Sequence, residues 1–369
     1  MKNLRKTFDF FIIFAGIMLK YFEFMFNISK IYIYIYFATL IFLIILSFKN
    51  YKTKKWNLLK IILITLGILI VTFESSGIDF AIPLLYALYY RNTNIKKILK
   101  YILFSSAIMF LSTIILANLN IIQSLALTRL DNDIIVYRNS LGFGHVNAVF
   151  FHFYIIAMLL YIFINSKYVS SAIILIVSSY IYSKTFCRTG MICICIFILF
   201  NLFTSQKSKD IIAKKGRYFF LGMTIISFLL AFLYGTGNNS LDILVSYRFS
   251  NWYKTITNYS LINFTGIKSS YYLDNLYLNL IYNYGIISYI LYLAVYYFSY
   301  DLIEDNKLKL SLVFFSIYGL FESNHVFYIN YSLFVLLYYS ISKFNKGGIS
   351  KNEENKYINT RFITKSRRH

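Results

Sequence analysis

The chain has 369 residues, of which 58% are hydrophobic and 14% are charged, and its mean hydropathy is +0.60. This composition excludes a pair of soluble domains, which the length alone would allow. Apolar runs of about 17 to 25 residues recur along the chain, and a helix of that length crosses the hydrocarbon core of a bilayer. The sequence therefore predicts an all-α integral membrane protein with about twelve transmembrane helices.

The predicted spans follow one another with short connectors. In chain order they are 8–26, 31–48, 56–73, 77–90, 99–118, 144–164, 168–184, 190–205, 218–234, 277–299, 310–321 and 326–342. The first is read as a retained span, because no small-residue cleavage site follows its basic start. The span 77–90 is short and holds Asp79 and Pro83, the only proline, which favours a tilt, a break or an incomplete crossing.

Lys and Arg crowd into alternate connectors. The clusters are Lys52, Lys54 and Lys55; Arg91, Lys96, Lys97 and Lys100; Lys207, Lys209, Lys214, Lys215 and Arg217; and the tail from Lys343 to Arg368. Basic residues beside spans are retained in the cytoplasm, so these connectors face inward and both termini are predicted to be cytoplasmic. We attribute most of the net charge of +22 to this topology signal and the basic tail, and expect no nucleic-acid partner.

Residues 1–346 are thus predicted to form one polytopic membrane domain, followed by a basic, polar cytoplasmic tail at 347–369 that we expect to be disordered. Two external loops, at about 118–144 and 235–276, are longer than a turn, and such loops are usually functional or disordered. The second loop contains Trp252 and several tyrosines. This aromatic content favours a segment that packs on the bundle or binds sugar rings.

Few residues suit soluble chemistry. Two of the three cysteines lie in an apolar run, only four histidines occur, and no Walker loop, zincin helix or nucleophile elbow is present. We therefore expect no disulfide framework, no metal and no cofactor.

The connectors predicted to face outward are poor in Lys and Arg, yet they hold every cluster that suggests chemistry. Arg138 is followed by Gly142 and Gly144, which allow a sharp turn, and by His145 and Asn147 in the first turn of a helix. Backbone N–H groups at a helix start beside an arginine form an anion site. A polar loop with helix-capping groups is the alternative.

A second cluster, Ser183–Gly190, is a short turn that contains Lys184 and Arg188. Arginine makes bidentate contacts with phosphate and stays charged when desolvated, which favours a phosphate role for Arg188 over interfacial snorkelling. A third cluster surrounds Arg248, where surface decoration is the alternative. A fourth begins with Asp274, which is also a plain helix N-cap.

The last cluster, Phe321–His325, places Glu322 and His325 in a short turn at a membrane edge. Such groups are costly there unless they pair or serve a function, and either could act as a general base. A solvated hairpin tip is the alternative.

These motifs together resemble the bacterial O-antigen and capsular polysaccharide polymerases (the Wzy type) and the related O-antigen ligases. The string R-N-S-L-G-F-G-H-V-N at 138–147 is similar to the Arg…Leu-Gly-Phe…His-Pro-Asn motif of the family, and C-R-T-G at 187–190 is similar to Ser-Arg-Thr-Gly. The D-N-x-Y…G segment from Asp274 and a late turn with a glutamate are also similar. Val146 and Cys187 depart from the pattern, but neither change removes a charged group.

The resemblance implies a metal-independent, inverting glycosyltransferase with a GT-C-like fold in the bacterial cytoplasmic membrane, and an active site on the external side. Donor and acceptor would be oligosaccharide repeat units linked to undecaprenyl pyrophosphate. Whether the chain acts alone or with a flippase and a chain-length regulator stays open.

The residue types fit this chemistry. Without a metal, fixed cations must stabilise the pyrophosphate leaving group, and Arg138, Arg188 and Arg248 are the candidates. Glu322 or His325, and less favourably Asp274, would accept the proton of the sugar hydroxyl. The candidates for sugar binding are His145, Asn147, Trp252 and Tyr277.

Other classes of protein share parts of the pattern. A ligase would use the same cations with a different acceptor. A transporter or flippase for lipid-linked sugars is the alternative without catalysis, although no internal repeat is visible and the charged residues gather at one edge. A purely structural membrane protein also remains.

Overall fold

The computed structural model describes residues 2–26, 31–49, 78–131, 134–236, 240–258, 264, 273–323 and 329–346, and most of them are helical. The first helices are α1 (Lys2–Phe26), α2 (Ile31–Lys49), α4 (Ile78–Tyr90) and α5 (Ile95–Asn118). Next come α6 (Val146–Phe163), α7 (Lys167–Thr185), α8 (Arg188–Phe203), α9 (Gln206–Lys215), the 3-10 turn η1 (Gly216–Tyr218) and α10 (Phe219–Tyr234). The last are α11 (Ser240–Leu244), α12 (Arg248–Asn258), α13 (Leu276–Tyr282), α14 (Ile286–Tyr300), α15 (Asn306–Tyr318) and α16 (Tyr331–Lys346).

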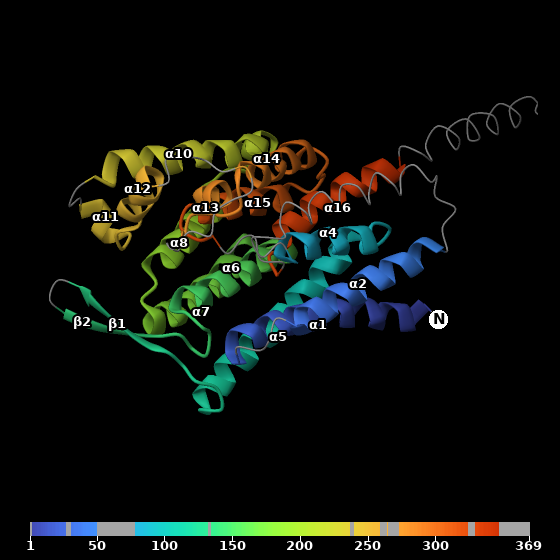
Figure 1. Cartoon of the computed structure of the whole chain (residues 1–369), viewed down its shortest axis with the longest axis horizontal. Helices are drawn as coiled ribbons and strands as arrows, with labels where there is room; N and C mark the ends of the chain where they lie inside the picture. Colours follow the sequence, from blue (N-terminus) through green and yellow to red (C-terminus); the bar gives the residue numbers. More distant parts are fainter. Residues whose placement is uncertain are drawn as a thin grey trace, which may run out of the picture.

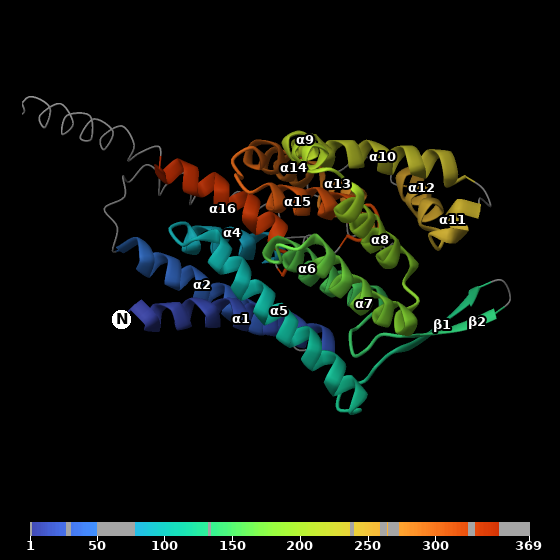
Figure 2. The same ribbon diagram turned by 180° about the vertical axis from the view of Figure 1, so that it is seen from behind.

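The helices form an elongated bundle (Figures 1 and 2). Three helical stretches in the described part are long and apolar enough to cross a membrane, namely 95–118, 146–163 and 206–234, and several shorter helices are also apolar. Large apolar side chains on α5 and α10, such as Phe104 and Leu233, are exposed, as lipid-facing residues are. These features indicate a membrane protein. The total of about twelve spans and their orientation stay predictions, and the predicted span 56–73 lies outside the described residues.

The central helix of the bundle is α6, which is 83% buried. It packs against α5, α7, α8 and α15, so it is apolar on all sides rather than on one stripe. Tyr154 of α6 stacks on Tyr318 of α15 with ring centroids 4.2 Å apart, and its hydroxyl donates to the carbonyl of Phe314 at 3.0 Å. This contact holds the end of α15, and the turn that follows it, against the centre of the bundle.

The loop at 118–144, which the sequence predicts to be external, contains a β-hairpin, an element that the sequence-based prediction did not include. Strand β1 (Ala126–Asp131) pairs antiparallel with β2 (Ile134–Asn139), with Leu127 opposite Arg138. Outside the bilayer the chain is free to satisfy its backbone groups in a ladder, and the run of β-branched and aromatic residues at 134–137 favours a strand. In both views the hairpin lies at the same end of the bundle as α11 and α12, and the labelled N-terminus lies at the other end (Figures 1 and 2).

The predicted continuous span at 277–299 is two helices in the structure. Helix α13 ends at Tyr282 and α14 begins at Ile286, and Gly285 between them has φ 88° and ψ 158°. Only glycine adopts this backbone conformation without strain, so Gly285 fixes the break. Asn275 caps the start of α13 by accepting hydrogen bonds from the N–H groups of Tyr277 and Leu278, each at 3.0 Å.

Substitution at this break is expected to destabilise the protein. Gly285→Ala should cost about 1–3 kcal/mol, because alanine must adopt a conformation that it avoids. The matched control is Gly222→Ala in α10, where an added Cβ meets nothing within 4 Å and where alanine favours the helix. The midpoint of thermal unfolding in detergent should fall for Gly285→Ala and stay level or rise for Gly222→Ala. Equal midpoints would contradict the role given to Gly285.

Candidate active site

Arg248 and two carboxylates from other parts of the chain form a buried charged cluster. Arg248 Nε lies 2.9 Å from Asp274 Oδ2, and Arg248 Nη2 lies 3.2 Å from Glu322 Oε1. The Arg248 residue is only 5% exposed and Glu322 only 1%. The structure thus joins the third, fourth and fifth sequence clusters, which are separated by up to 74 positions.

The loop before α12 determines where Arg248 points. Ser246 and Tyr247 both have φ near +60°, a left-handed conformation that non-glycine residues rarely adopt. Asp242 holds this turn, because its carboxylate accepts hydrogen bonds from the N–H groups of Phe249 at 2.8 Å and Ser250 at 3.3 Å, and from the Ser250 hydroxyl. Arg248 therefore begins α12 in a position held by a buried acid.

The two carboxylates sit on segments that are tied to each other. The N–H of Leu276 donates to the carbonyl of Gly319 at 2.8 Å, and Asn275 Nδ2 donates to the carbonyl of Leu320 at 3.1 Å. Asp274 and Glu322 are therefore held on two neighbouring backbone segments that belong to no helix or strand. Trp252 Nε1 donates to Asp274 Oδ1 at 3.1 Å, which fixes the second oxygen of that carboxylate.

Arg138 belongs to a second group, built from β2, the start of α6 and the turn between α7 and α8. Arg138 Nε donates to the carbonyl of Thr185 at 2.9 Å, and Arg138 Nη2 donates to Asn147 Oδ1 at 3.1 Å. The Cys187 thiol also donates to Asn147 Oδ1, at 3.4 Å. His145 is the N-cap of α6, where its Nδ1 accepts from the N–H of Asn147 at 3.2 Å. The structure thus brings the first and second sequence clusters together.

The turn into α6 has the predicted glycine conformation at Gly142, whose φ is 85°. A Cβ at this position would lie 3.1 Å from the carbonyl of Thr113 and 2.9 Å from Ala117 Cβ. Leu141 before it is also left-handed, with φ 50°, and its N–H donates to Asn139 Oδ1 at 2.7 Å. The sharp turn brings Arg138 back over the start of α6.

The two groups share one electrostatic environment. Partial burial lowers the pKa of His145, and the positive charges of Arg138 and then Arg248 lower it further, so both guanidinium groups act on this ring. Burial raises the pKa of the Cys187 thiol, and the next influence on it is the charge of Glu322. His145 is thus neutral near pH 7, and Cys187 is a protonated hydrogen-bond donor.

Within the cluster, burial raises the pKa of Glu322 to about 7, although Arg248 opposes the shift. Burial by itself would lower the pKa of Arg248, but the charges of Asp274 and then Glu322 raise it above its ordinary value, so the guanidinium is permanently charged. Arg248 Nη1 is buried and has no hydrogen-bond partner in the described part of the chain. The cluster therefore offers an unused donor beside a carboxyl group that titrates near neutrality.

The remaining predicted site residues are placed differently. Arg188 begins α8 directly after Cys187, next to the Arg138 group. Trp252 and Tyr277 are fully buried, and the Tyr277 hydroxyl donates to the carbonyl of Ser316 at 2.5 Å. Both aromatic residues therefore pack inside the protein, where Trp252 donates to Asp274, and their role in sugar binding stays a prediction. His325 lies outside the described residues.

Sequence reasoning missed two residues of this site. Asp242, which positions Arg248, lies in a loop where nothing in the sequence distinguishes it from a surface acid. Cys187 was identified only as a departure from the serine of the family motif and was given no role, yet it contacts Asn147, and the charge of Glu322 acts on its thiol. The sequence feature that could have indicated this role is the position of Cys187 directly before Arg188, in a turn rich in polar residues.

Comparison with known proteins adds no relative, since no family model, no curated protein and no solved structure matches the chain. In the described part of the chain, no three His, Cys, Asp or Glu residues are grouped so that they could hold a metal ion.

Removing the buried guanidinium should destabilise the protein strongly. Arg248→Ala leaves two buried carboxylates without their cation, which typically costs about 3–5 kcal/mol. The double variant Arg248→Ala/Glu322→Gln should recover part of this loss, because one of the orphaned charges is gone. Arg217→Ala, which breaks the more exposed Arg217–Asp301 pair, is the control and should change the unfolding midpoint little, because solvent screens that pair. Additive losses in the double variant, measured by thermal unfolding, would contradict direct coupling.

Proposed function

We propose that the protein is a membrane glycosyltransferase that joins oligosaccharide repeat units linked to undecaprenyl pyrophosphate, as a polysaccharide polymerase with its active site on the external side of the bacterial cytoplasmic membrane. The observation that carries the proposal is the convergence at Arg248. Of the sequence clusters that the resemblance picked out separately, the one around Glu322 pairs with this buried guanidinium beside its unused Nη1 donor, and the charges of Arg138 and Arg248 both act on the His145 ring.

The leaving group of the proposed reaction is a lipid-linked pyrophosphate. Arg138, Arg188 and Arg248 would bind its oxygens, and fixed cations in a site shielded from water stabilise developing negative charge strongly. Arg248 is paired with Glu322 in this structure. A pyrophosphate oxygen on Arg248 would compete with that pair, so donor binding would release the Glu322 carboxylate for the reaction.

Glu322 is the preferred general base. The acceptor hydroxyl attacks the anomeric carbon, the bond from that carbon to the pyrophosphate oxygen breaks with its electron pair, and the hydroxyl proton passes to Glu322. A base with a pKa near the working pH transfers protons most effectively, and burial gives Glu322 such a pKa, of about 7. Asp274 is held by Arg248 and Trp252, which suits a residue that orients the cation.

The proposal predicts a defined change in glycan size. In cells that lack this chain, complementation with Arg248→Lys, which keeps the charge but not the planar fork, should lower polymer yield about 100-fold or more. Single repeat units on the lipid carrier should accumulate in place of polymer. Lys254→Ala, an exposed position in the same helix, is the matched control and should restore wild-type polymer.

Other outcomes of this experiment point to other functions. Full-length polymer stranded on the lipid carrier would indicate a ligase, and repeat units trapped on the cytoplasmic face would indicate a flippase. An unchanged glycan profile without this chain would overturn all three functions.

A second prediction concerns pH. Because the reaction needs ionised Glu322, the rate of polymer formation by the purified protein in nanodiscs should rise as pH increases through about 7 and then level off. Glu322→Gln should remove this rise together with most of the rate, since the amide accepts no proton. A wild-type rate that is flat between about pH 6 and 8 would count against Glu322 as the base.

A further inference from the structure

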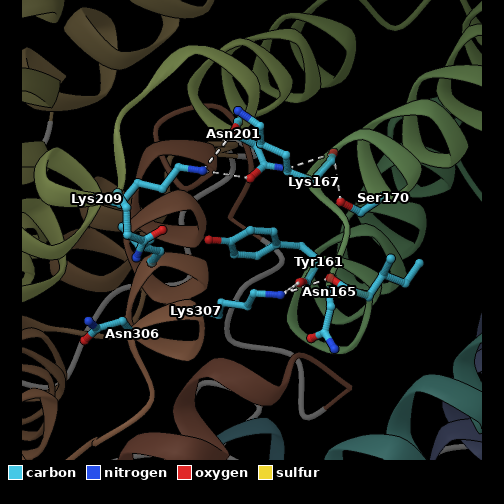
Figure 3. Close-up of a pocket in the computed structure, with 11 residues that line it drawn as sticks. Tyr161, Asn165, Lys167, Ser170, Asn201, Lys209, Asn306 and Lys307 are labelled. Carbon is cyan, nitrogen blue, oxygen red and sulfur yellow. Dashed lines mark hydrogen bonds between the residues drawn. The ribbon is translucent and has the colours of Figure 1, made fainter.

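A second candidate site lies at the opposite ends of the helices from the Arg248 cluster. It is a cavity of about 220 Å³ between the C-terminal end of α6, the start of α7, the α8–α9 connection and the start of α15 (Figure 3). The predicted topology places this end of the helices on the cytoplasmic side.

Three lysines from three different helices line this cavity, namely Lys167 of α7, Lys209 of α9 and Lys307 of α15. Lys209 is 6% exposed, and its ammonium group donates to the side-chain and backbone oxygens of Asn201 at 3.1 and 2.7 Å. Burying a cation is costly, so a cavity that brings three of them together needs a compensating negative charge.

Hydrogen bonds hold the other two lysines at the rim of the cavity. Lys307 Nζ donates to the carbonyl of Ile164 at 2.9 Å and lies over the ring of Tyr161, and Lys167 Nζ donates to the carbonyl of Leu202 at 2.8 Å. An ammonium group has three N–H donors, so each keeps capacity for a ligand.

The helix ends add to the positive potential. Helices α7, α9 and α15 all begin at this cavity, and their first residues Lys167, Gln206 and Asn306 line it. The N-terminus of a helix carries a partial positive charge and favours anions. The starts of α7 and α9, capped by the neutral Ser166 and Ser205, therefore act on the same space as the three ammonium groups, whereas the start of α15 is capped by the Asp305 carboxylate.

No acidic side chain offsets this charge inside the cavity, since none of its eleven lining residues is Asp or Glu. Two acids lie beside it with other partners. Asp210 accepts hydrogen bonds from Gln206 and Asn306, at 3.0 and 2.8 Å. Asp305 pairs with Lys96 at 2.8 Å and caps α15 by accepting from the N–H groups of Lys307 and Leu308 at 3.0 and 3.3 Å, so it offsets part of the charge at the start of α15.

We propose that this cavity, defined by Lys167, Lys209 and Lys307, binds a phosphate group on the cytoplasmic side of the membrane, distinct from the donor pyrophosphate on the other side. The phosphate of an anionic lipid headgroup and free inorganic phosphate share this chemistry. Basic pockets between membrane helices on the cytoplasmic side are suited to anionic headgroups. The inference does not depend on the proposed glycosyl transfer.

The test measures the midpoint of thermal unfolding of the full chain in phosphatidylcholine nanodiscs. One series adds phosphatidylglycerol to the bilayer, and the other adds inorganic phosphate to the buffer. The variant Lys167→Gln/Lys307→Gln leaves the deeply buried Lys209 in place. The control is Lys207→Gln, which removes an exposed lysine of the same helix α9 that does not line the cavity.

We expect wild type and Lys207→Gln to be stabilised by at least one probe, and the double variant to bind that probe about tenfold more weakly or worse. A response to phosphatidylglycerol alone identifies a lipid headgroup, and a response to inorganic phosphate identifies a soluble ligand. Either supports the site. The site is overturned if the wild-type protein responds to neither probe, or if the double variant responds like wild type. If the double variant does not fold, the single variant Lys167→Gln at the half-buried rim decides the comparison.

Discussion

The architecture of the end of the bundle that holds α11 and α12 depends on keeping one guanidinium group buried and charged. Arg248 reaches its place only because Asp242 holds the turn before α12, and it stays there because Asp274 and Glu322 neutralise it. The ion pairs with Asp274 and Glu322 therefore join the segment that begins α12 to the segments before α13 and after α15. The arrangement is costly in solvation free energy unless all partners are present, which makes this part of the protein intolerant of single changes.

The same interaction explains how a site can be both stable and reactive. Burial favours the neutral form of Glu322, and Arg248 favours the charged form, so the pKa settles at about 7 rather than at either extreme. A ligand that takes over the guanidinium alters this balance directly. In the proposed reaction, the negative charge of the donor would thus influence the protonation of the base through a contact that already exists.

The sequence predicts the helices well because membrane spans have a length and composition that few other segments share. It predicts the helix break at Gly285 and the hairpin at 126–139 poorly. Gly285 lies in an otherwise continuous apolar run, and the hairpin lies in a connector between predicted spans, where span length no longer constrains the chain. The motif residues were identified, but their meeting was not, because positions as distant as Arg248 and Glu322 are joined only by tertiary packing.

The sequence also could not predict which aromatic side chains are buried and which are exposed. Trp252 and Tyr277 were candidates for sugar binding, and packing on the bundle was the alternative for the aromatic residues of this loop; both side chains are buried here, where a large apolar ring gains from packing. Asp242 was not identified from the sequence, because an acid in a predicted loop resembles any surface acid. Its role is apparent only from the structure, where its carboxylate accepts hydrogen bonds from the N–H groups at the start of α12.

The length of α15 has a consequence for where the reaction would occur. A helix of 13 residues is about 20 Å long, whereas the hydrocarbon core is about 30 Å thick. Helix α15 is buried within the bundle, so its end needs no contact with lipid. With Lys307 at the predicted cytoplasmic surface, the turn that carries Glu322 would end below the level of the opposite headgroups, and in the proposed reaction the hydrophilic sugars would descend into the protein to meet it.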